Sequence, residues 1–276
     1  LFVPLGYSLK AHRFMIEAHL QLFIDMRLDK FICKSTELTK RDAVRDIHAG
    51  NILVNDAIVL DESTQVHENN IITLNGQRLK PRPFRYLLMH KPANTICSNT
   101  DGDYPSLFNQ LDADGVHGLN RDELHIAGRL DVDTTGLVLI TDDGRWTYNI
   151  TRPDKDCKKV YRVGLSYGIP EHKVATLVER FEQGIQLQGE QGLTQPALLE
   201  VLLSDCEGEA SGKSGESKDV LLTITEGKYH QVKRMFAAVG NRVLSLHREK
   251  IGDIQLDVEE GQWRFLTAHE VSSFTR

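Results

Sequence analysis

A run of acidic, basic and hydroxyl side chains within residues 127–144 is the part of the sequence best suited to chemistry. Arg129, Asp131 and Asp133 form a polar turn, and the apolar run 137–140 that follows has the length and composition of a buried strand. A carboxylate held on a rigid element, with a cation nearby, is the arrangement in which proteins present a reactive acid. The spacing therefore predicts a catalytic or binding role for Asp131, with an ordinary structural turn as the alternative.

Two further segments carry candidate residues. Tyr161 lies in an alternating run that predicts a strand, where a tyrosine most often packs in the core or at a sheet edge. The segment 227–236, Gly-Lys-Tyr-His-Gln-Val-Lys-Arg-Met-Phe, predicts a turn that leads into a helix with Lys233 and Arg234 on its basic face. These two cations either belong to a solvated helix face or serve as partners for Asp131 or for a phosphate group.

The composition is that of a soluble globular protein, and 276 residues suffice for one large domain or two ordinary ones. The four cysteines are scattered without a Cys-x-x-Cys pair, which argues against a zinc site or a disulfide framework and favours a reducing cytoplasm. No apolar run reaches the roughly 18 residues of a membrane helix, so we expect no membrane span. The net charge of −6 argues against a nucleic-acid partner when the chain is considered as a whole. The segments 151–162 and 226–250 are locally basic, however, and could form a phosphate-binding groove.

Patterning divides the chain into four parts. Residues 1–25 show little periodicity, and we expect a poorly ordered extension before Met26. Residues 26–80 predict two helices and a small sheet, with Thr39 as the N-cap of the second helix. The Pro-rich, charged segment 81–84 predicts a linker between two domains.

Residues 85–276 predict a larger α+β domain with a mixed, largely antiparallel sheet flanked by helices, because strands adjacent in the sequence alternate with hairpins and helices. Within this domain, residues 94–122 are rich in turn formers, and we expect them to wrap the surface. The segment 204–219, rich in Gly, Ser and acidic residues, is expected to be a flexible hairpin tip.

The smaller predicted domain carries six cations on its two helices, which form either a solvated face or a phosphate-binding module. The segments 26–32 (Met-Arg-Leu-Asp-Lys-Phe-Ile), 39–43 (Thr-Lys-Arg-Asp-Ala) and 50–55 (Gly-Asn-Ile-Leu-Val-Asn) resemble an S4 RNA-binding domain. The resemblance implies that both helices lie on folded RNA. The phosphate contacts that it implies are Arg27, Lys40, Arg41 and Arg45.

The larger predicted domain resembles a pseudouridine synthase. The motif Ala-Gly-Arg-Leu-Asp-x-Asp-Thr-Thr-Gly-Leu at 127–137 is similar to the most diagnostic motif of that superfamily, whose catalytic aspartate corresponds to Asp131. The segments 193–197, 229–241 and 246–252 look like those of the enzymes that act on small-subunit ribosomal RNA. The resemblance implies uridine 516 of 16S ribosomal RNA as the target. We also expect a partly assembled ribonucleoprotein as the substrate and a cytoplasmic monomer as the enzyme.

The resemblance also implies roles for the candidate residues. An ionised Asp131 in a water-poor pocket needs a buried cation, and the resemblance assigns it to Lys233, where many relatives carry arginine, with Arg234 in reserve. Tyr161 would stack on the flipped base, and Arg129 would fill the vacated stack or hold a phosphate. No metal, redox cofactor or external energy source is expected.

Asp133 is expected to cap the turn through Thr134 and Thr135. Three alternatives to this function stay open at the level of sequence. One is a pseudouridine synthase that acts on 23S ribosomal RNA, and another is a non-enzymatic assembly factor built on the S4 domain. The third is a phosphotransferase of the Asp-x-Asp-x-Thr kind, with Asp131 as nucleophile, Asp133 as acid and Mg²⁺ between them.

Overall fold

The computed structural model describes residues 26–67, 69–113, 121–202 and 216–274. The chain divides between Phe84 and Arg85 into two compact units, which we call the first and the second unit. The expected extension 1–25 and most of the expected hairpin tip 204–219 lie outside the described residues. Among the described helices, none combines the length and the apolar character that crossing a membrane requires.

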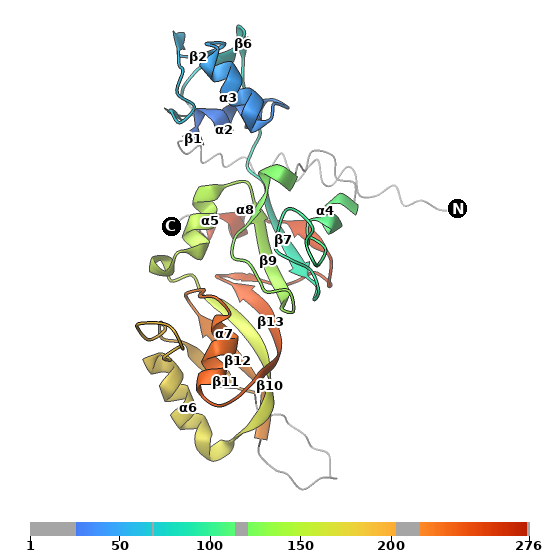
Figure 1. Cartoon of the computed structure of the whole chain (residues 1–276), viewed down its shortest axis with the longest axis vertical. Helices are drawn as coiled ribbons and strands as arrows, with labels where there is room; N and C mark the ends of the chain where they lie inside the picture. Colours follow the sequence, from blue (N-terminus) through green and yellow to red (C-terminus); the bar gives the residue numbers. More distant parts are fainter. Residues whose placement is uncertain (1–25, 68, 114–120, 203–215, 275–276) are drawn as a thin grey trace, which may run out of the picture. The chain divides into compact units, whose positions relative to one another are not determined.

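The first unit consists of two short helices and a small antiparallel sheet (Figure 1, blue to teal). Its elements are β1 (Met26–Arg27), α2 (Leu28–Ser35), α3 (Lys40–His48), β2 (Ile52–Val54), β3 (Ala57–Ile58), β4 (Gln65–Val66), β5 (Ile72–Leu74) and β6 (Gln77–Arg78). The sheet order is β3-β2-β5-β6, and β1 pairs with β4. Leu28 and Ile32, four apart on α2, are fully buried with Ile47 of α3 and Ile52 of the sheet, because residues at this spacing share one helix face.

The start of α3 follows the sequence prediction. The hydroxyl of Thr39 accepts a hydrogen bond from the backbone N–H of Asp42 at 3.2 Å, as an N-cap side chain does. At the other end of the unit, the backbone N–H of Arg82 donates to the carbonyl of Lys34 at 2.9 Å. The Lys34 ammonium lies 3.8 Å from the centre of the Phe84 ring, a cation–π contact that attaches residues 82–84 to α2.

The second unit is built on a nine-stranded sheet flanked by helices (Figure 1). Its strands are β7 (Tyr86–Lys91), β8 (His125–Ile126), β9 (Thr135–Thr141), β10 (Lys159–Pro170), β11 (Leu198–Val201), β12 (Glu216–Ile224), β13 (Val243–Ile251), β14 (Ile254–Gln255) and β15 (Trp263–Phe265). The main order is β11-β12-β10-β13-β9-β7-β15, with β14 on β13 and β8 on β9. Every pairing between the strands of this sheet is antiparallel except that of β13 with β9, so the mixed, largely antiparallel α+β prediction is confirmed.

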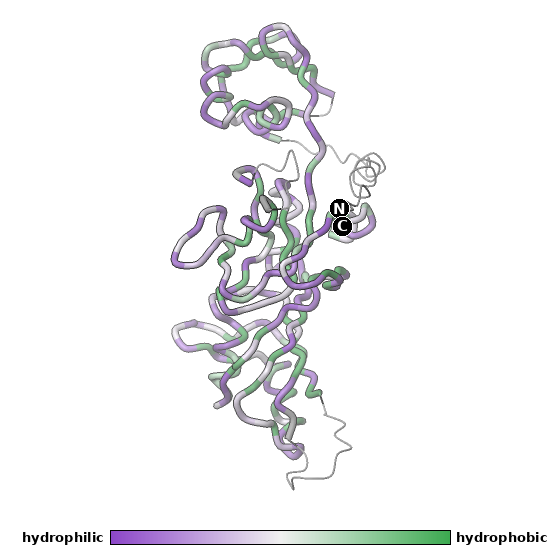
Figure 2. The backbone as a smooth tube through the Cα atoms, turned by 90° about the vertical axis from the view of Figure 1, so that its right-hand side faces the viewer, coloured by the Kyte–Doolittle hydropathy of each residue, from purple (hydrophilic) through white to green (hydrophobic). Residues whose placement is uncertain are grey.

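Helices cover this sheet in two groups. They are α4 (Asn109–Ala113), α5 (Gly144–Thr151), α6 (Glu171–Gln183), α7 (Gln231–Ala238) and α8 (Ala268–Ser272), with 3₁₀ turns at Arg121–Glu123 and Pro153–Lys155. Helix α6 packs on β10 and β11, and α7 packs on β13. Helices α5 and α8 contact each other at the other end of the sheet, where the indole N–H of Trp146 on α5 donates to the carbonyl of Val271 on α8 at 3.0 Å. Figure 2 shows hydrophobic stretches of backbone within the second unit, and the buried side chains of its strands and helices form two core clusters.

The parallel contact between β9 and β13 joins the two halves of the sheet. Its registered partners are Thr135 with His247 and Gly136 with Arg248. Gly136 has φ +110°, and a Cβ atom there would lie 2.3 Å from the carbonyl oxygen of Arg248. Only glycine therefore allows the two strands to approach this closely at the point where the candidate turn ends.

The segment 94–122 agrees only in part with its expected path over the surface. Residues 100–105 are exposed, as its turn formers predict, but Leu107 and Phe108 are fully buried and Leu111 is 3% exposed. Turn-forming residues determine the local path of this segment, whereas its few large apolar side chains turn inward because burying them stabilises the core. Residues 114–120 lie outside the described residues.

Candidate active site

Asp131 lies in the turn between β8 and β9, with 30% of its side chain exposed. A buried lysine binds the backbone of this turn. The ammonium of Lys91, at the end of β7, donates to the carbonyl oxygens of Thr134 at 2.8 Å, Pro92 at 3.0 Å and Val132 at 3.3 Å. Burial lowers the pKa of Lys91, while the charges of nearby acidic groups act in the opposite direction. A charge removed from water is stabilised here by three fixed carbonyl dipoles, which makes the turn rigid.

A buried arginine holds the other side of the turn. The guanidinium of Arg248, on β13 and 2% exposed, donates to the carbonyl oxygens of Leu137 and Gly128, each at 2.7 Å. Its remaining terminal nitrogen donates to the hydroxyl of Tyr161 at 3.3 Å. Arg248 therefore links the start of the turn to Tyr161, whose side chain faces inward from β10 and is 8% exposed. The planar fork of arginine suits this task, because it fixes three acceptors at once.

Lys233 supplies the cation that the sequence led us to expect beside Asp131. Its ammonium donates to the carboxylate of Asp131 at 3.0 Å and to that of Asp133 at 2.6 Å. Burial lowers the pKa of Lys233, but the hydrogen bonds and charges of the two carboxylates outweigh this effect and raise it. For Asp133, partial burial raises the pKa, but the hydrogen bond and charge of Lys233, together with smaller contributions from a backbone hydrogen bond and from His230, lower it overall. The pair of carboxylates thus shares one ammonium ion.

The expectation that Asp133 caps the turn is corrected by these contacts. Its side chain is 63% exposed, and its carboxylate binds Lys233. The carbonyl oxygens of the turn are held instead by Lys91, which is absent from the residues proposed from sequence. Asp-Thr-Thr favours a short local cap, but a buried ammonium reaches more of the backbone acceptors at once.

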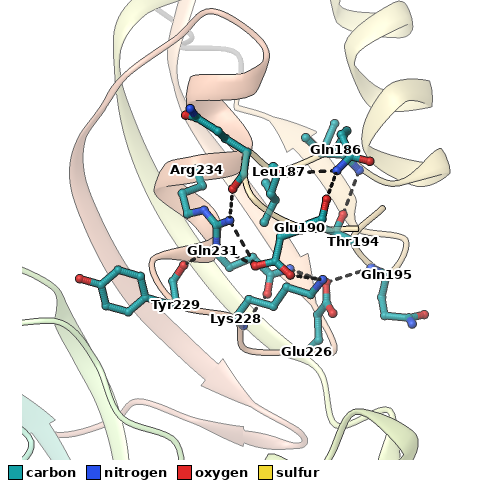
Figure 3. A network of polar contacts seen from close by, with 12 residues as sticks. Gln186, Leu187, Glu190, Thr194, Gln195, Glu226, Lys228, Tyr229, Gln231 and Arg234 are labelled. Carbon is teal, nitrogen blue, oxygen red and sulfur yellow. Dashed lines mark hydrogen bonds and ion pairs between the residues drawn. The ribbon is translucent and has the colours of Figure 1, made fainter. Parts of the chain in front are cut away.

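Arg234, the neighbour of Lys233 on α7, points to a different partner. Its guanidinium binds the carboxylate of Glu190 at 3.2 Å and donates to the carbonyl oxygens of Gln188 at 2.8 Å and Tyr229 at 3.1 Å. Figure 3 shows Arg234 and Lys228 turned toward Glu190 from two sides. The hydrogen bonds of these two cations lower the pKa of Glu190. Of the two cations considered for Asp131, the structure therefore brings Lys233 to it and Arg234 to Glu190.

His230 is a second neighbour of Asp131, and it is absent from the residues proposed from sequence. Its imidazole Nε2 lies 3.5 Å from the second carboxylate oxygen of Asp131. The backbone of His230 has φ +48° and ψ +34°, in the left-handed region, and it forms the N-cap of α7. Such a conformation is uncommon for residues other than glycine and is often found at functional sites. Arg129 belongs to the same turn, and its side chain is exposed to solvent.

Of the residues missed from sequence, Lys91 had a readable signal and Arg248 did not. Arg248 lies in the polar run 247–250, whereas Lys91 ends a run that predicts a strand, two positions after the fully buried Met89. A charge in such a position is buried only where it has fixed partners, so it marks a structural or functional contact. His230 had no comparable signal, because its backbone conformation depends on the packing of α7.

The first unit presents the cations expected to contact RNA. Arg27 is paired with the buried carboxylate of Asp29 at 3.1 Å, and Lys40 lies 3.9 Å from the same group with its side chain 78% exposed. Arg41 is exposed at the start of α3. Arg45 is 71% exposed and pairs with Asp42 at 3.1 Å. Their exposure leaves these charges accessible to a phosphate backbone.

The geometry of the second unit defines the chemistry it can perform. A carboxylate of Asp131 is held by an ammonium ion, in a turn that two buried cations make rigid, and a tyrosine is connected to the same turn through Arg248. Charged groups fixed in this way before a substrate arrives need no reorganisation during a reaction. The arrangement suits attack by a carboxylate or removal of a proton by it.

Comparison with known proteins agrees with this description. The RNA pseudouridylate synthase family model matches residues 85–238, and the S4 domain model matches residues 26–72. The chain is 47% identical over 251 residues to "Ribosomal small subunit pseudouridine synthase A" of Vibrio parahaemolyticus, covering 90% of this chain and 99% of the relative. It is 42% identical over 254 residues to the protein of the same name from Haemophilus influenzae, covering 91% of this chain and all of the relative.

A solved structure described as a pseudouridylate synthase is also similar. It superimposes with a TM-score of 0.59 at 42% sequence identity and covers 90% of this chain and 99% of that one. The resemblance stated from the motif at 127–137 and from the helices of the first unit is thereby confirmed. The chain, an S4 domain followed by a catalytic domain, belongs to the RNA pseudouridylate synthase family.

Proposed function

We propose that this protein converts one uridine of small-subunit ribosomal RNA to pseudouridine, with Asp131 as the reacting carboxylate. The observation that carries the proposal is the 3.0 Å contact between Asp131 and the ammonium of Lys233, in a turn that two buried cations hold. The names of the two relatives and the segments 193–197, 229–241 and 246–252 support a small-subunit substrate. The target that we propose within it is uridine 516 of 16S ribosomal RNA.

The reaction breaks the N1–C1′ bond of uridine and forms a C5–C1′ bond, so that the base loses its proton at C5 and gains one at N1. All atoms are conserved, and the step needs a group that can bond to the sugar or base, or remove a proton, and then be released. An ionised carboxylate meets this need, and Lys233 stabilises the charge of Asp131 before and after the base is turned. Lys233 offers a point charge where an arginine would bind both carboxylate oxygens, and it can therefore serve Asp133 as well.

Tyr161 and Arg129 are proposed to handle the base that leaves the RNA stack. Tyr161 presents an aromatic ring and a hydroxyl, and the contact of that hydroxyl with Arg248 fixes the orientation of the ring. A flipped uracil is held by such stacking and by hydrogen bonds to its edge. Arg129, exposed at the turn, would fill the vacated position in the RNA or bind a phosphate. Arg234 would act indirectly, since Glu190 holds its guanidinium.

The first unit is proposed to deliver the substrate. Arg27, Lys40, Arg41 and Arg45 would contact phosphates of the folded RNA, which positions the synthase domain without reading the base sequence. We propose that a partly assembled ribonucleoprotein is the substrate and that the enzyme acts as a cytoplasmic monomer. A phosphotransferase is disfavoured by one contact: the ammonium of Lys233 occupies the position between Asp131 and Asp133 that Mg²⁺ would need.

The test is conversion of uridine in purified RNA. Wild-type protein and the Asp131→Asn variant are incubated with small-subunit and large-subunit ribosomal RNA, each naked and partly assembled, and pseudouridines are mapped chemically. We expect conversion at one small-subunit site by the wild type and a loss of at least about 10⁴-fold in the variant, because the amide can neither attack nor accept a proton. The variant should still bind the RNA, since the first unit is unchanged.

Three outcomes would contradict the proposal. Conversion that survives Asp131→Asn would remove Asp131 from the chemistry. Conversion confined to large-subunit RNA would support the 23S alternative. A tight RNA complex with no conversion by the wild type on any substrate would support a non-enzymatic assembly factor.

A further inference from the structure

Tyr229 is an aromatic residue that contributes little to the core of the second unit. It is 77% exposed, more than any other large hydrophobic residue among those the structure describes. Its ring stacks on that of His230, with centroids 3.8 Å apart and an angle of 21° between the planes. In Figure 3 its ring points away from the polar network around Glu190. Such an exposed ring gains little from folding, so its placement calls for another explanation.

This two-ring stack lies at the reacting carboxylate. The imidazole of His230 forms one layer of the stack, and its Nε2 is 3.5 Å from Asp131. His230, in the left-handed region, forms the N-cap of α7, so Tyr229 lies just before the helix. A ring resting on Tyr229 would therefore lie close to any uridine that Asp131 attacks.

The backbone on both sides of the stack is anchored. The carbonyl of Tyr229 accepts a hydrogen bond from Arg234 at 3.1 Å, and Arg234 is held in turn by Glu190 at 3.2 Å. The backbone N–H of Lys228 donates to the side-chain oxygen of Gln231 at 2.8 Å. Gln231 is buried and also donates to Glu226 at 2.7 Å. Figure 3 shows these contacts, which fix the backbone that carries the ring, and the stack on His230 holds the ring itself, so that binding costs less entropy.

We propose that Tyr229, backed by His230, is a stacking platform for an unpaired RNA base next to the target uridine. The inference rests on the proposed function and adds a substrate-positioning residue to it. When a uridine leaves the stack, its neighbours lose a stacking partner, and an exposed, fixed aromatic ring replaces part of that interaction. Stacking needs only the face of the ring, so the hydroxyl of Tyr229 is dispensable.

The experiment compares Tyr229→Ala with Tyr229→Phe in full-length protein, acting on partly assembled small-subunit ribonucleoprotein and, in parallel, on naked small-subunit RNA. We expect Tyr229→Ala to lower kcat/KM about tenfold, as loss of one base–aromatic stack does, and Tyr229→Phe to stay within about twofold of wild type. The matched control is Tyr167→Ala, which removes a tyrosine that is 66% exposed on β10. This control should leave kcat/KM unchanged.

A second measurement identifies the stacked base. The nucleotides on each side of the converted uridine are replaced one at a time by an abasic nucleotide. For the base that stacks, the abasic RNA should slow the wild type about tenfold and slow Tyr229→Ala no further, because both changes remove the same interaction. His230 both stacks on Tyr229 and contacts Asp131 through Nε2, and the His230→Phe variant keeps the ring but removes the Nε2 contact. In this variant the abasic RNA should reduce the rate by the same factor as in wild type.

Four results would overturn the inference. The first is an equal loss of kcat/KM in Tyr229→Phe and Tyr229→Ala, and the second is a loss in Tyr167→Ala as large as that in Tyr229→Ala. The third is that Tyr229→Ala and the abasic change act independently at both neighbouring positions. The fourth is a defect of Tyr229→Ala that is seen only on protein-containing particles. The last would assign the ring to a protein partner. Each requires that the wild type convert uridine, so a wild-type protein without activity would contradict the proposed function instead.

Discussion

The cations that hold the turn of Asp131 in the second unit are buried, whereas those expected to meet RNA in the first unit lie on its surface. Lys91 is fully buried and Arg248 is 2% exposed, and both donate to fixed carbonyl oxygens. The side chains of Lys40 and Arg45 are 78% and 71% exposed, and the structure shows each beside a single carboxylate. The two units therefore use positive charge under very different conditions of solvation.

This difference matches two different tasks. A buried cation interacts strongly because water does not screen it, and it must be held by several acceptors, so it is suited to fixing the geometry of a reacting group. An exposed cation is screened by salt and mobile, so each one contributes little alone, and several together bind a phosphate backbone of varying shape. Changes around Asp131 should therefore affect the rate of conversion, and changes on α3 should affect the affinity for RNA.

The sharpest test of the comparison pairs Lys233→Gln with Lys40→Gln. Lys233→Gln should lower the single-turnover rate at saturating RNA by about 10²- to 10³-fold, because it removes a preorganised charge beside the carboxylate that we propose to react. Lys40→Gln should leave that rate unchanged and raise the RNA concentration needed for half-saturation by less than about threefold. The comparison would be broken if both variants reduced the saturated rate by the same factor.

The role of the buried guanidinium of Arg248 can be tested with the Arg248→Lys variant. This change keeps the charge but cannot reach Leu137, Gly128 and Tyr161 together, so we expect the saturated rate to fall about 10- to 100-fold. Both tryptophans, Trp146 and Trp263, belong to the second unit, so tryptophan fluorescence during thermal unfolding shows whether that unit remains folded. A folded variant with the wild-type rate would show that charge alone is sufficient.

The surface cations are tested by replacing Lys40, Arg41 and Arg45 together with glutamine. RNA affinity should fall, and the slope of the logarithm of affinity against the logarithm of salt concentration should become shallower by roughly 2, at about 0.7–0.9 for each phosphate that is no longer neutralised. The saturated rate should stay within about twofold of wild type. Lys173→Gln, an exposed change on α6, serves as the control, and an equal change of slope there would mean that the effect is non-specific.

The smallest predicted effect concerns stability at high pH. Burial lowers the pKa of Lys91 below its ordinary value of 10.5, so between these two values the unfolded chain binds more protons than the folded one. Lys91 therefore destabilises the fold while it is charged, and this effect is lost as the pH rises toward about 10.5. Urea unfolding followed by tryptophan fluorescence from about pH 8 should show a more positive slope of stability with pH in wild type than in Lys91→Met. Identical slopes would show that Lys91 does not titrate in this range.

Several parts of this protein could be predicted from the sequence because the signal is local. The apolar residues of α2 and α3 repeat at helical spacing, and Thr39 precedes the second helix as a hydroxyl N-cap. The run 137–140 lies within β9, and the polar turn before it carries Asp131. In each case neighbours within about four residues determine the conformation, and such neighbours are visible in the sequence.

The contacts around Asp131 are not local. Lys91 is 41 positions from Val132 along the chain, Lys233 is 102 from Asp131, and Arg248 is 120 from Gly128. The sheet order brings these segments together, and the parallel contact of β9 with β13 depends on the sheet as a whole. Chain-local preferences carry no information about such pairings, so the acceptors that Lys91 and Arg248 bind became known only from the folded structure.

Lys233 and Arg234 show what the sequence determined about the partner of Asp131 and what depended on the tertiary structure. The sequence by itself determined that a helix with a basic face at 233 and 234 covers about residues 229–239 and that Asp131 sits in a polar turn before a strand. Successive residues on a helix point about 100° apart, so only one of the two cations can face the carboxylate. The burial of Val232, Met235 and Phe236 sets the rotation of α7, and the tertiary structure thereby directs Lys233 to Asp131 and Arg234 to Glu190.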